Sequence, residues 1–229
     1  MKALILSGGI GKRLKPITDY VPKPLIPLNN IPIIEWQIRY FKKFGIKEFV
    51  ICTGYKSDQI INYLKPKKIG AKIDFSIEKT SLGTGGAIKN ASKFLDDENF
   101  FVINGDVITD LDPMKLKTNP NSIAVIPLRV SFGIVTLNKN KAKIFEEKPE
   151  ISDRWMNAGI YYLSKEILKH LPKKGNIEHS TFPILASKGS LIAVKYEKNF
   201  WYSIDSHKDI EECENKMKSL NYEKFISKK

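Results

Sequence analysis

A glycine-rich turn near the start of the chain has the residue types that hold phosphate groups. The stretch Leu6-Ser7-Gly8-Gly9-Ile10-Gly11-Lys12-Arg13 directly follows a short apolar run. Glycines let the backbone approach a ligand, and the amide groups of such a turn point at phosphate oxygens. Arg13 can bind phosphate through two hydrogen bonds, which suits a triphosphate whose pyrophosphate end must leave. A tight connection between two elements uses the same residue types, so the turn alone leaves both interpretations open.

The turn differs from two common phosphate-binding fingerprints. A dinucleotide fingerprint that begins at Gly9 needs glycine at position 14, where the chain has Leu14. A Walker P-loop needs Ser or Thr after Gly11-Lys12, where the chain has Arg13. The sequence therefore indicates a phosphate-binding turn of another kind.

A lysine between two prolines follows the turn, in the segment Pro22-Lys23-Pro24-Leu25. The prolines stiffen the backbone and hold one ammonium group in place, although a rigid loop with an exposed lysine has the same sequence. Together with residues 8–18, which read G-G-x-G-x-R-L-x-P-x-T, this segment resembles the signature of the sugar-phosphate nucleotidyltransferase family. Every fixed position of that signature is present, and further motifs continue to near the C-terminus.

The resemblance implies a nucleotide site formed by two glycine-rich segments. The second is Leu82-Gly83-Thr84-Gly85-Gly86-Ala87, similar to the family segment that receives the nucleobase. Small residues at the start of a helix let a flat base lie against the backbone; a helix start capped by Thr84 is the alternative. The residues expected to bind nucleotide are Leu6, Gly8, Gly9, Gly11, Glu78, Gly83 and Thr84.

A carboxylate follows an apolar strand at Asn104-Gly105-Asp106. Open α/β sheets place ligands at the carboxyl ends of their strands, and a hard carboxylate suits Mg²⁺. The resemblance implies that Asp106 is a metal ligand. On its residues alone, the segment is equally typical of a plain turn.

The chain departs from the family pattern near its C-terminus. The family commonly has W-x-D-I-G-T or W-x-D-I-D-T, whereas this chain has Ser203 at the first aspartate position and Asp205 at the second. We expect Asp205 to complete the metal site with Asp106; capping of the helix that follows is its alternative role. If the metal needs the first position, the site is weakened.

Motifs in the second half imply a site for a sugar phosphate. Phe132-Gly133 resembles the aromatic-glycine pair under the sugar, and residues 146–149 match E-E-K-P. The resemblance implies that Glu147 binds sugar hydroxyls and Lys148 the sugar phosphate, although an arbitrary Glu-Lys pair is usually surface decoration. The N-A-G motif at 157–159 and the glutamate before Phe182-Pro183 complete the expected substrate-binding set, which is Gly133, Glu147, Lys148, Asn157 and Glu178.

The reaction implied by the resemblance is nucleotidyl transfer with Mg²⁺, in which a sugar 1-phosphate attacks the α-phosphorus of a nucleoside triphosphate. Arg13 would stabilise the departing pyrophosphate and Lys23 the α-phosphate region. The segment 82–87 most resembles that of family members that use GTP with mannose 1-phosphate or a related heptose phosphate, and the expectation is the activity of a mannose-1-phosphate guanylyltransferase. Alternatives are heptose- or glucose-1-phosphate nucleotidyltransferases, choline- or inositol-phosphate cytidylyltransferases, and a non-catalytic nucleotide-sugar-binding regulatory subunit.

Alternating strands and helices must position these residues in the first half. This order predicts a Rossmann-like three-layer α/β/α fold with a mostly parallel mixed sheet covered by helices on both faces. The predicted strands are 2–7, Glu48–Thr53, 72–77 and 99–104, and the predicted helices are 32–44, Asp58–Leu64 and 84–95.

The pattern becomes rich in strands after about residue 122. We expect strands at Ser122–Leu128, Ile134–Leu137, Lys143–Glu146 and Gly159–Leu163, and a final helix at about 206–220. Because no linker separates the two parts, the sequence predicts one domain over 1–229. Its nucleotide-binding half is 1–121 and its sugar-phosphate-binding half is 122–229.

The formal net charge is +13, from 38 basic and 25 acidic residues, which favours anionic partners. The lysines are scattered, whereas nucleic-acid readers cluster basic residues with aromatics, so we expect small phosphorylated substrates and not nucleic acid; an RNA-binding module is the alternative. No apolar run approaches the roughly 20 residues that span a bilayer, and the apolar start is too short for a signal peptide. The expectation is a cytoplasmic protein with two reduced cysteines and no membrane association. The sequence leaves the oligomeric state open, and a homo-oligomer is compatible with it.

Overall fold

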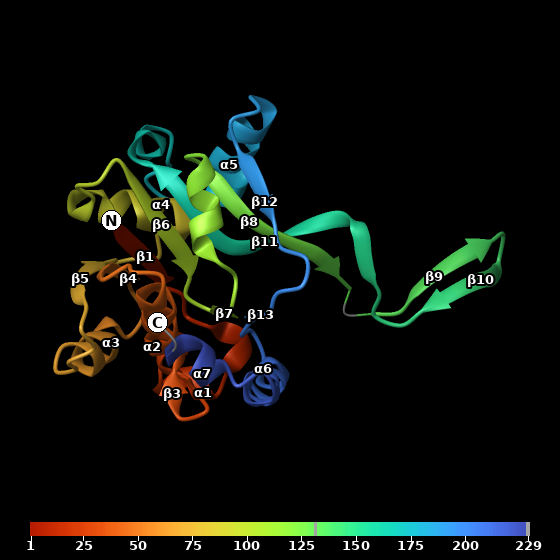
Figure 1. Cartoon of the computed structure of the whole chain (residues 1–229), viewed down its shortest axis with the longest axis horizontal. Coiled ribbons are helices and arrows are strands. Elements are labelled where there is room, and N and C mark those ends of the chain that lie inside the picture. Colours follow the sequence, from red (N-terminus) through yellow and green to blue (C-terminus); the bar gives the residue numbers. More distant parts are fainter. Residues whose placement is uncertain (131, 228–229) are drawn as a thin grey trace.

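A seven-stranded mixed sheet runs through the computed structural model, which describes residues 1–130 and 132–227 (Figure 1). Only β11 runs against its neighbours, since it is antiparallel to β6 and β8 while the other pairs are parallel. The predicted mostly parallel mixed sheet is confirmed. Its strand order is β12 (Ile192–Lys195), β8 (Ser122–Arg129), β11 (Glu150–Ser164), β6 (Asn99–Asn104), β1 (Lys2–Ser7), β4 (Glu48–Thr53) and β5 (Lys72–Ile77).

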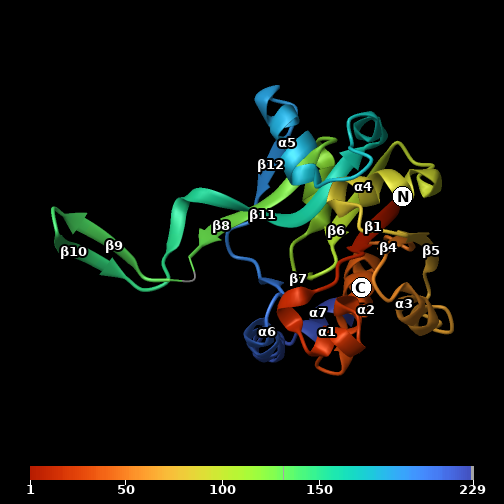
Figure 2. The same ribbon diagram turned by 180° about the vertical axis from the view of Figure 1, so that it is seen from behind.

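Helices cover both faces of the sheet because successive residues of its buried strands point to opposite sides. Ala3 and Ile5 of β1 belong to one hydrophobic core, and Leu4 between them belongs to the other. The predicted three-layer arrangement is therefore confirmed (Figures 1 and 2). The first core is covered by α2 (Ile33–Lys43), α3 (Ser57–Leu64), α6 (His207–Ser219) and α7 (Tyr222–Ser227), and the second by α4 (Gly83–Asn90) and α5 (Ile177–Ser187).

The predicted elements of the first half agree with the structure to within a few residues, except that the helix predicted over 84–95 ends at Asn90 and continues as a 3₁₀ turn. No element was predicted between residues 163 and 206, where α5, β12 and further short elements lie. The apolar residues of α5 lack a regular helical spacing, and a proline, Pro183, lies inside the helix. Both features argue against a helix in the sequence. The short elements are η1 (Lys12–Leu14), α1 (Ile17–Tyr20), η2 (Lys23–Leu25), β2 (Pro27–Leu28), β3 (Ile31–Pro32), η3 (Ala91–Phe94), β7 (Val107–Thr109), η4 (Pro113–Thr118), η5 (Lys165–Lys169) and β13 (Trp201–Ser203).

A β-hairpin stands away from the body of the molecule in both views (Figures 1 and 2). It consists of β9 (Ile134–Asn138) and β10 (Lys141–Glu146), which form a two-stranded sheet of their own. We call residues 132–149 the arm. The two strands predicted at this place are confirmed, but they pair with each other and not with the main sheet.

A buried carboxylate joins α2 to α3. Glu35 is almost inaccessible to solvent and accepts hydrogen bonds from Arg39 at 2.6 Å, from Tyr63 at 2.5 Å and from Lys67 at 2.6 Å. Burial alone would raise the pKa of Glu35, but its three donors outweigh burial and lower that pKa from 4.5 to about 2.

The Glu35→Gln variant should be less stable than the wild type at neutral pH, and the difference should be smaller in acid. Because the folded pKa lies below the unfolded one, the stabilisation is complete above about pH 5 and is lost as the pH falls toward about 2. We expect the difference in unfolding free energy between wild type and variant to shrink by on the order of 2 kcal/mol between about pH 6 and about pH 3. Urea unfolding of both proteins at both pH values measures this difference. A difference in unfolding free energy that does not change with pH would contradict the prediction.

Among residues 1–130 and 132–227, no helix is long and apolar enough to cross a membrane.

Candidate active site

The turn after β1 forms one wall of a cleft. Thr18 holds the turn, since its hydroxyl donates a hydrogen bond of 3.0 Å to the carbonyl oxygen of Gly11. Gly11 also packs against the P-K-P-L segment, because a Cβ atom at Gly11 would lie 3.2 Å from Cβ of Lys23, the first residue of η2. The cleft is lined by Leu6, Ser7, Gly9, Gly11, Lys12, Arg13, Leu14, Lys23, Pro24, Gly105, Asp106 and Asp205.

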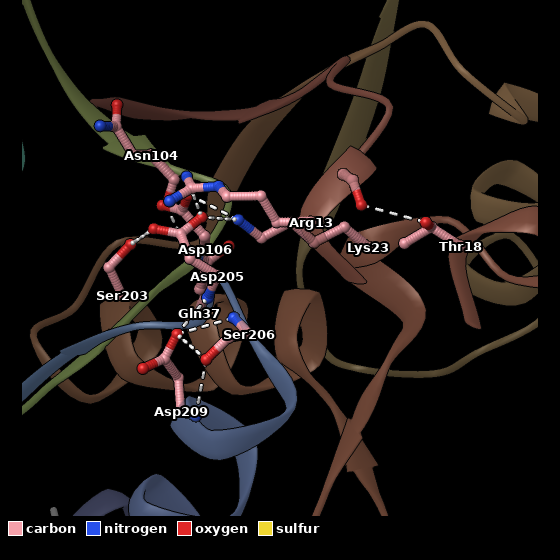
Figure 3. A network of polar contacts seen from close by, with 11 residues as sticks. Arg13, Thr18, Lys23, Gln37, Asn104, Asp106, Ser203, Asp205, Ser206 and Asp209 are labelled. Carbon is pink, nitrogen blue, oxygen red and sulfur yellow. Dashed lines mark hydrogen bonds and ion pairs between the residues drawn. The ribbon is translucent and has the colours of Figure 1, made fainter. Parts of the chain in front are cut away.

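Two cations and two carboxylates meet in this cleft (Figure 3). The Nζ atom of Lys23 lies 2.8 Å from Oδ2 of Asp106 and 2.9 Å from Oδ1 of Asp205. Nη2 of Arg13 lies 2.7 Å from the same oxygen of Asp205. The structure thus brings together four of the residues that the sequence singled out, and both carboxylates converge on one position that a cation fills.

Asp205 keeps its carboxylate free of helix capping. Ser206 is the N-cap of α6 and forms a capping box with Asp209, so the capping role considered for Asp205 is wrong. Ser203 donates a hydrogen bond of 3.0 Å to Oδ2 of Asp205. The serine at the family's first aspartate position therefore helps to hold the carboxylate at the second position. Burial raises the pKa of Asp205, but the hydrogen bond and charge of Lys23 outweigh burial, and the resulting pKa lies below the ordinary value.

The turn that carries Asp106 packs tightly on the end of β1. The amide of Gly105 donates a hydrogen bond of 3.0 Å to the carbonyl oxygen of Leu6. A Cβ atom on Gly105 would lie 2.3 Å from that oxygen, so only glycine allows this approach. The close approach places Asp106 beside the glycine-rich turn.

Gln37 of α2 holds the same turn from below. Its Nε2 atom donates a hydrogen bond of 2.8 Å to the carbonyl oxygen of Asn104 (Figure 3). It donates another of 2.9 Å to the carbonyl oxygen of Val107. The sequence pattern includes Gln37 only as part of the buried helix face and does not predict this role. A polar residue on an apolar helix face is the signal that could have found it.

A second pocket adjoins the cleft and shares Leu6, Gly9, Gly105 and Asp106 with it. Glu78 forms part of its wall, and its Oε2 accepts a hydrogen bond of 3.0 Å from the amide of Leu82. Burial raises the pKa of Glu78. Six of the seven residues expected to bind nucleotide line this pocket, and the seventh, Gly11, lines the cleft; the six are Leu6, Gly8, Gly9, Glu78, Gly83 and Thr84.

A chain of hydrogen bonds links this pocket to two residues expected at the sugar. The hydroxyl of Thr84 donates to Glu178, which accepts a hydrogen bond of 3.2 Å from Tyr161. Asn157 in turn donates one of 2.8 Å to the hydroxyl of Tyr161. Thr84 therefore binds α5 and is not the cap of α4, whose N-cap is Leu82. Tyr161 was not predicted, because only the folded sheet brings it to Glu178.

The remaining predicted sugar residues lie on the arm. Gly133, Glu147 and Lys148 are exposed, and Nζ of Lys148 lies 4.0 Å from Oε1 of Glu147. Among the described residues, no arm residue lines the cleft or the second pocket. The structure does not bring these three residues to the other site residues, because β9 and β10 pair only with each other.

Comparison with known proteins identifies the family. A family model described as "Nucleotidyl transferase" matches residues 2–219. The chain belongs to this nucleotidyl transferase family.

Two relatives within the nucleotidyl transferase family have names that specify a reaction. The chain is 42% identical over 172 residues to D-glycero-alpha-D-manno-heptose 1-phosphate guanylyltransferase of Campylobacter jejuni. That match covers 73% of this chain and 77% of the relative. It is 36% identical over 225 residues to mannose-1-phosphate guanyltransferase of Yarrowia lipolytica. That match covers 91% of this chain and 62% of the relative, so the chain spans less than two thirds of that protein.

A solved structure matches nearly the whole of this nucleotidyl transferase. The crystal structure of HddC from Yersinia pseudotuberculosis complexed with GMP-PN has a TM-score of 0.74 and 27% sequence identity. The match covers 94% of this chain and 99% of that chain.

Asp106 and Asp205 are the two carboxylates of this nucleotidyl transferase that could share a magnesium ion with the phosphates of a nucleotide. Within the described ranges, no group of three or more His, Cys, Asp or Glu side chains could hold a metal ion. Mg²⁺ usually binds through one or two carboxylates together with phosphate oxygens and waters, so it does not need such a group. Asp106 and Asp205 already face a common cation, the ammonium of Lys23, which shows that their oxygens can share one.

Proposed function

We propose that this chain joins a nucleoside triphosphate to a sugar 1-phosphate, releasing pyrophosphate and an NDP-sugar. The observation that carries the proposal is the position of Lys23, whose Nζ lies 2.8 Å from Asp106 and 2.9 Å from Asp205, with Arg13 paired to the same aspartate. Cations beside two carboxylates, next to a glycine-lined pocket, are the groups that phosphoryl chemistry requires.

The reaction proceeds by in-line displacement at the α-phosphorus. An oxygen of the sugar 1-phosphate forms the new bond to phosphorus, and the bond to the pyrophosphate oxygen breaks. The attacking oxygen is already anionic, so no general base is needed, and positioning and charge neutralisation lower the barrier. Arg13 stabilises the departing pyrophosphate, and Lys23 neutralises oxygens of the α-phosphate. Asp106 and Asp205 would hold Mg²⁺, which would supply further neutralisation of phosphate charge.

Guanosine triphosphate is the nucleotide that we propose. Both relatives named above are guanylyltransferases, and the solved relative is complexed with GMP-PN. We propose that the base enters the second pocket, between the turn after β1 and the start of α4. Glu78 lines that pocket, and its carboxylate can accept hydrogen bonds from a base.

The sugar that we propose has the manno configuration, with mannose 1-phosphate first and a manno-heptose 1-phosphate second. The names of the two relatives support this choice. Asn157 and Glu178 are proposed to contact it, because Glu178 bonds to Thr84 of the second pocket. For Gly133, Glu147 and Lys148, the family resemblance alone supports a role at the sugar.

The test is pyrophosphate release by the purified chain with Mg²⁺ and each of the four common nucleoside triphosphates. Each nucleotide is combined with mannose 1-phosphate, a manno-heptose 1-phosphate and glucose 1-phosphate. We expect release with GTP and a manno sugar to exceed the other pairs by at least about 10-fold, the discrimination that a few pocket contacts provide. Release with another pair would change the substrates but keep the reaction. Nucleotide binding without release under any condition would favour the regulatory subunit.

A further inference from the structure

The arm presents one apolar face to solvent. Val135 lies opposite Phe145, and Leu137 lies opposite Ala142 in the hairpin register. Because alternate residues of a strand point to the same side, these four side chains share one face. Their exposure is high for apolar residues, at 42% for Val135, 63% for Leu137 and 66% for Phe145.

The hairpin is built to keep this face continuous. Ala142 and Phe145 are three residues apart, which in a regular strand would place them on opposite faces. The register shifts between Ala142 and Ile144, and this irregularity returns both side chains to one face. An isolated two-stranded hairpin is marginally stable in water, and a contiguous exposed apolar patch marks an interaction site. We therefore expect another protein surface to pack against the apolar face of the arm.

The two ends of the arm carry opposite charge. The distal part, residues 138–143, contains no acidic residue and has three lysines, which are Lys139, Lys141 and Lys143. The proximal end carries Glu146 and Glu147, and Glu150 follows the arm directly in the chain. Lys148 lies 4.0 Å from Glu147 and Arg129 lies 4.0 Å from Glu150, so two of these three glutamates are ion-paired and the net charge here is −1, against +3 at the distal end.

We propose that the arm is a dimerisation surface whose partner is the arm of a second copy of this chain. The two arms lie antiparallel about a two-fold axis with their apolar faces in contact. A two-fold contact uses the same patch on both subunits, so the patch must be complementary to itself. The arm meets this condition, because antiparallel pairing puts the lysine end of each arm on the glutamate end of the other. This inference does not depend on the proposed function.

The arm is small, so the dimer should be of moderate strength. Each strand has five or six residues, about 17–20 Å in length, which places an arm-to-arm contact at the low end of interface sizes. We therefore expect a monomer–dimer equilibrium with a Kd on the order of 10 µM.

Sedimentation velocity of the full chain between about 1 and about 200 µM tests the dimer and the role of the apolar face. We expect wild-type dimer at the upper concentrations, and monomer throughout for Leu137→Glu. The matched control is Ile184→Glu, which introduces the same charge at a side chain of α5 that is 53% exposed, and it should dimerise like the wild type. A monomeric wild type, or a Leu137→Glu variant that dimerises like the wild type, would overturn the proposal. A monomer whose arm amides are protected from hydrogen exchange would show instead that the arm folds onto its own subunit.

Exchange of charges between the two ends tests the antiparallel arrangement. One variant carries Lys139→Glu, Lys141→Glu and Lys143→Glu, and the other carries Glu146→Lys, Glu147→Lys and Glu150→Lys. Each variant alone places like charges together and should dimerise at least about 10-fold more weakly than the wild type. A mixture should form heterodimers, detected by mass, because opposite charges then meet at both ends. Mixtures that give no heterodimers, or variants that dimerise alone like the wild type, would exclude this arrangement.

Discussion

Replacing Asp106 by asparagine is expected to lower turnover about 10³-fold, the upper range for loss of one preorganised electrostatic group. Asparagine has the same shape but no charge, so the cleft would keep one carboxylate, that of Asp205, to share a cation. Lys23 would also lose the partner that lies 2.8 Å from its Nζ atom. We expect the loss to appear in kcat, because the charge acts where the phosphoryl group transfers.

Metal binding gives this prediction a measurement that is independent of turnover. Binding of Mn²⁺ in the presence of nucleotide, followed by electron paramagnetic resonance, should weaken at least about 10-fold in Asp106→Asn. Nucleotide must be present, because Lys23 fills the space between the carboxylates in the free protein. The control is Asp19→Asn, which removes an exposed carboxylate paired with Lys15 at 2.8 Å and outside both pockets. Turnover and Mn²⁺ affinity close to wild type in Asp106→Asn would remove Asp106 from the reaction.

Local sequence patterns predicted the elements that lie against this site. The apolar run of β1 and the helical spacing of α2 are properties of neighbouring residues, so they are visible in the sequence. The roles of Gly105 and Gln37 depend on contacts with Leu6, Asn104 and Val107, which distant segments supply only after folding. The sequence therefore predicted which residues surround the cleft but not which residues hold Asp106 in place.

The arm shows the opposite limit of sequence reasoning. Its two strands were predicted because the short segments Ile134–Leu137 and Lys143–Glu146 look like strands and their spacing leaves little room for a helix between them, which is a local property. The position of the hairpin in the molecule depends on which surface packs against Leu137 and Phe145. The spacing of apolar residues in the sequence carries no information about that surface. The family motif placed Glu147 and Lys148 at a sugar, whereas the structure has them exposed, directly after β10 at the proximal end of the arm.

Replacing Arg13 by alanine is expected to lower turnover by about 10²–10³-fold with little effect on stability. The Arg13 side chain is 74% exposed, and its ion pair with Asp205 contributes little to folding at such a position. In the proposed mechanism its guanidinium would face the charge that develops on the departing pyrophosphate, where a fixed cation has its largest effect. A fall in kcat without a change in melting temperature would separate this role from a structural one.

Two further variants define what Arg13 provides. Arg13→Lys keeps the charge but loses the planar pair of donors, so we expect a turnover between those of the wild type and Arg13→Ala. Lys15→Ala removes a cation two positions away that pairs with Asp19 and lines neither pocket, and it should behave like the wild type. If Arg13→Ala turned over like Lys15→Ala, the general positive charge of the chain, +13 in total, would suffice to hold pyrophosphate. A large difference between them would instead require a cation fixed in the cleft, because the two substitutions change the net charge equally.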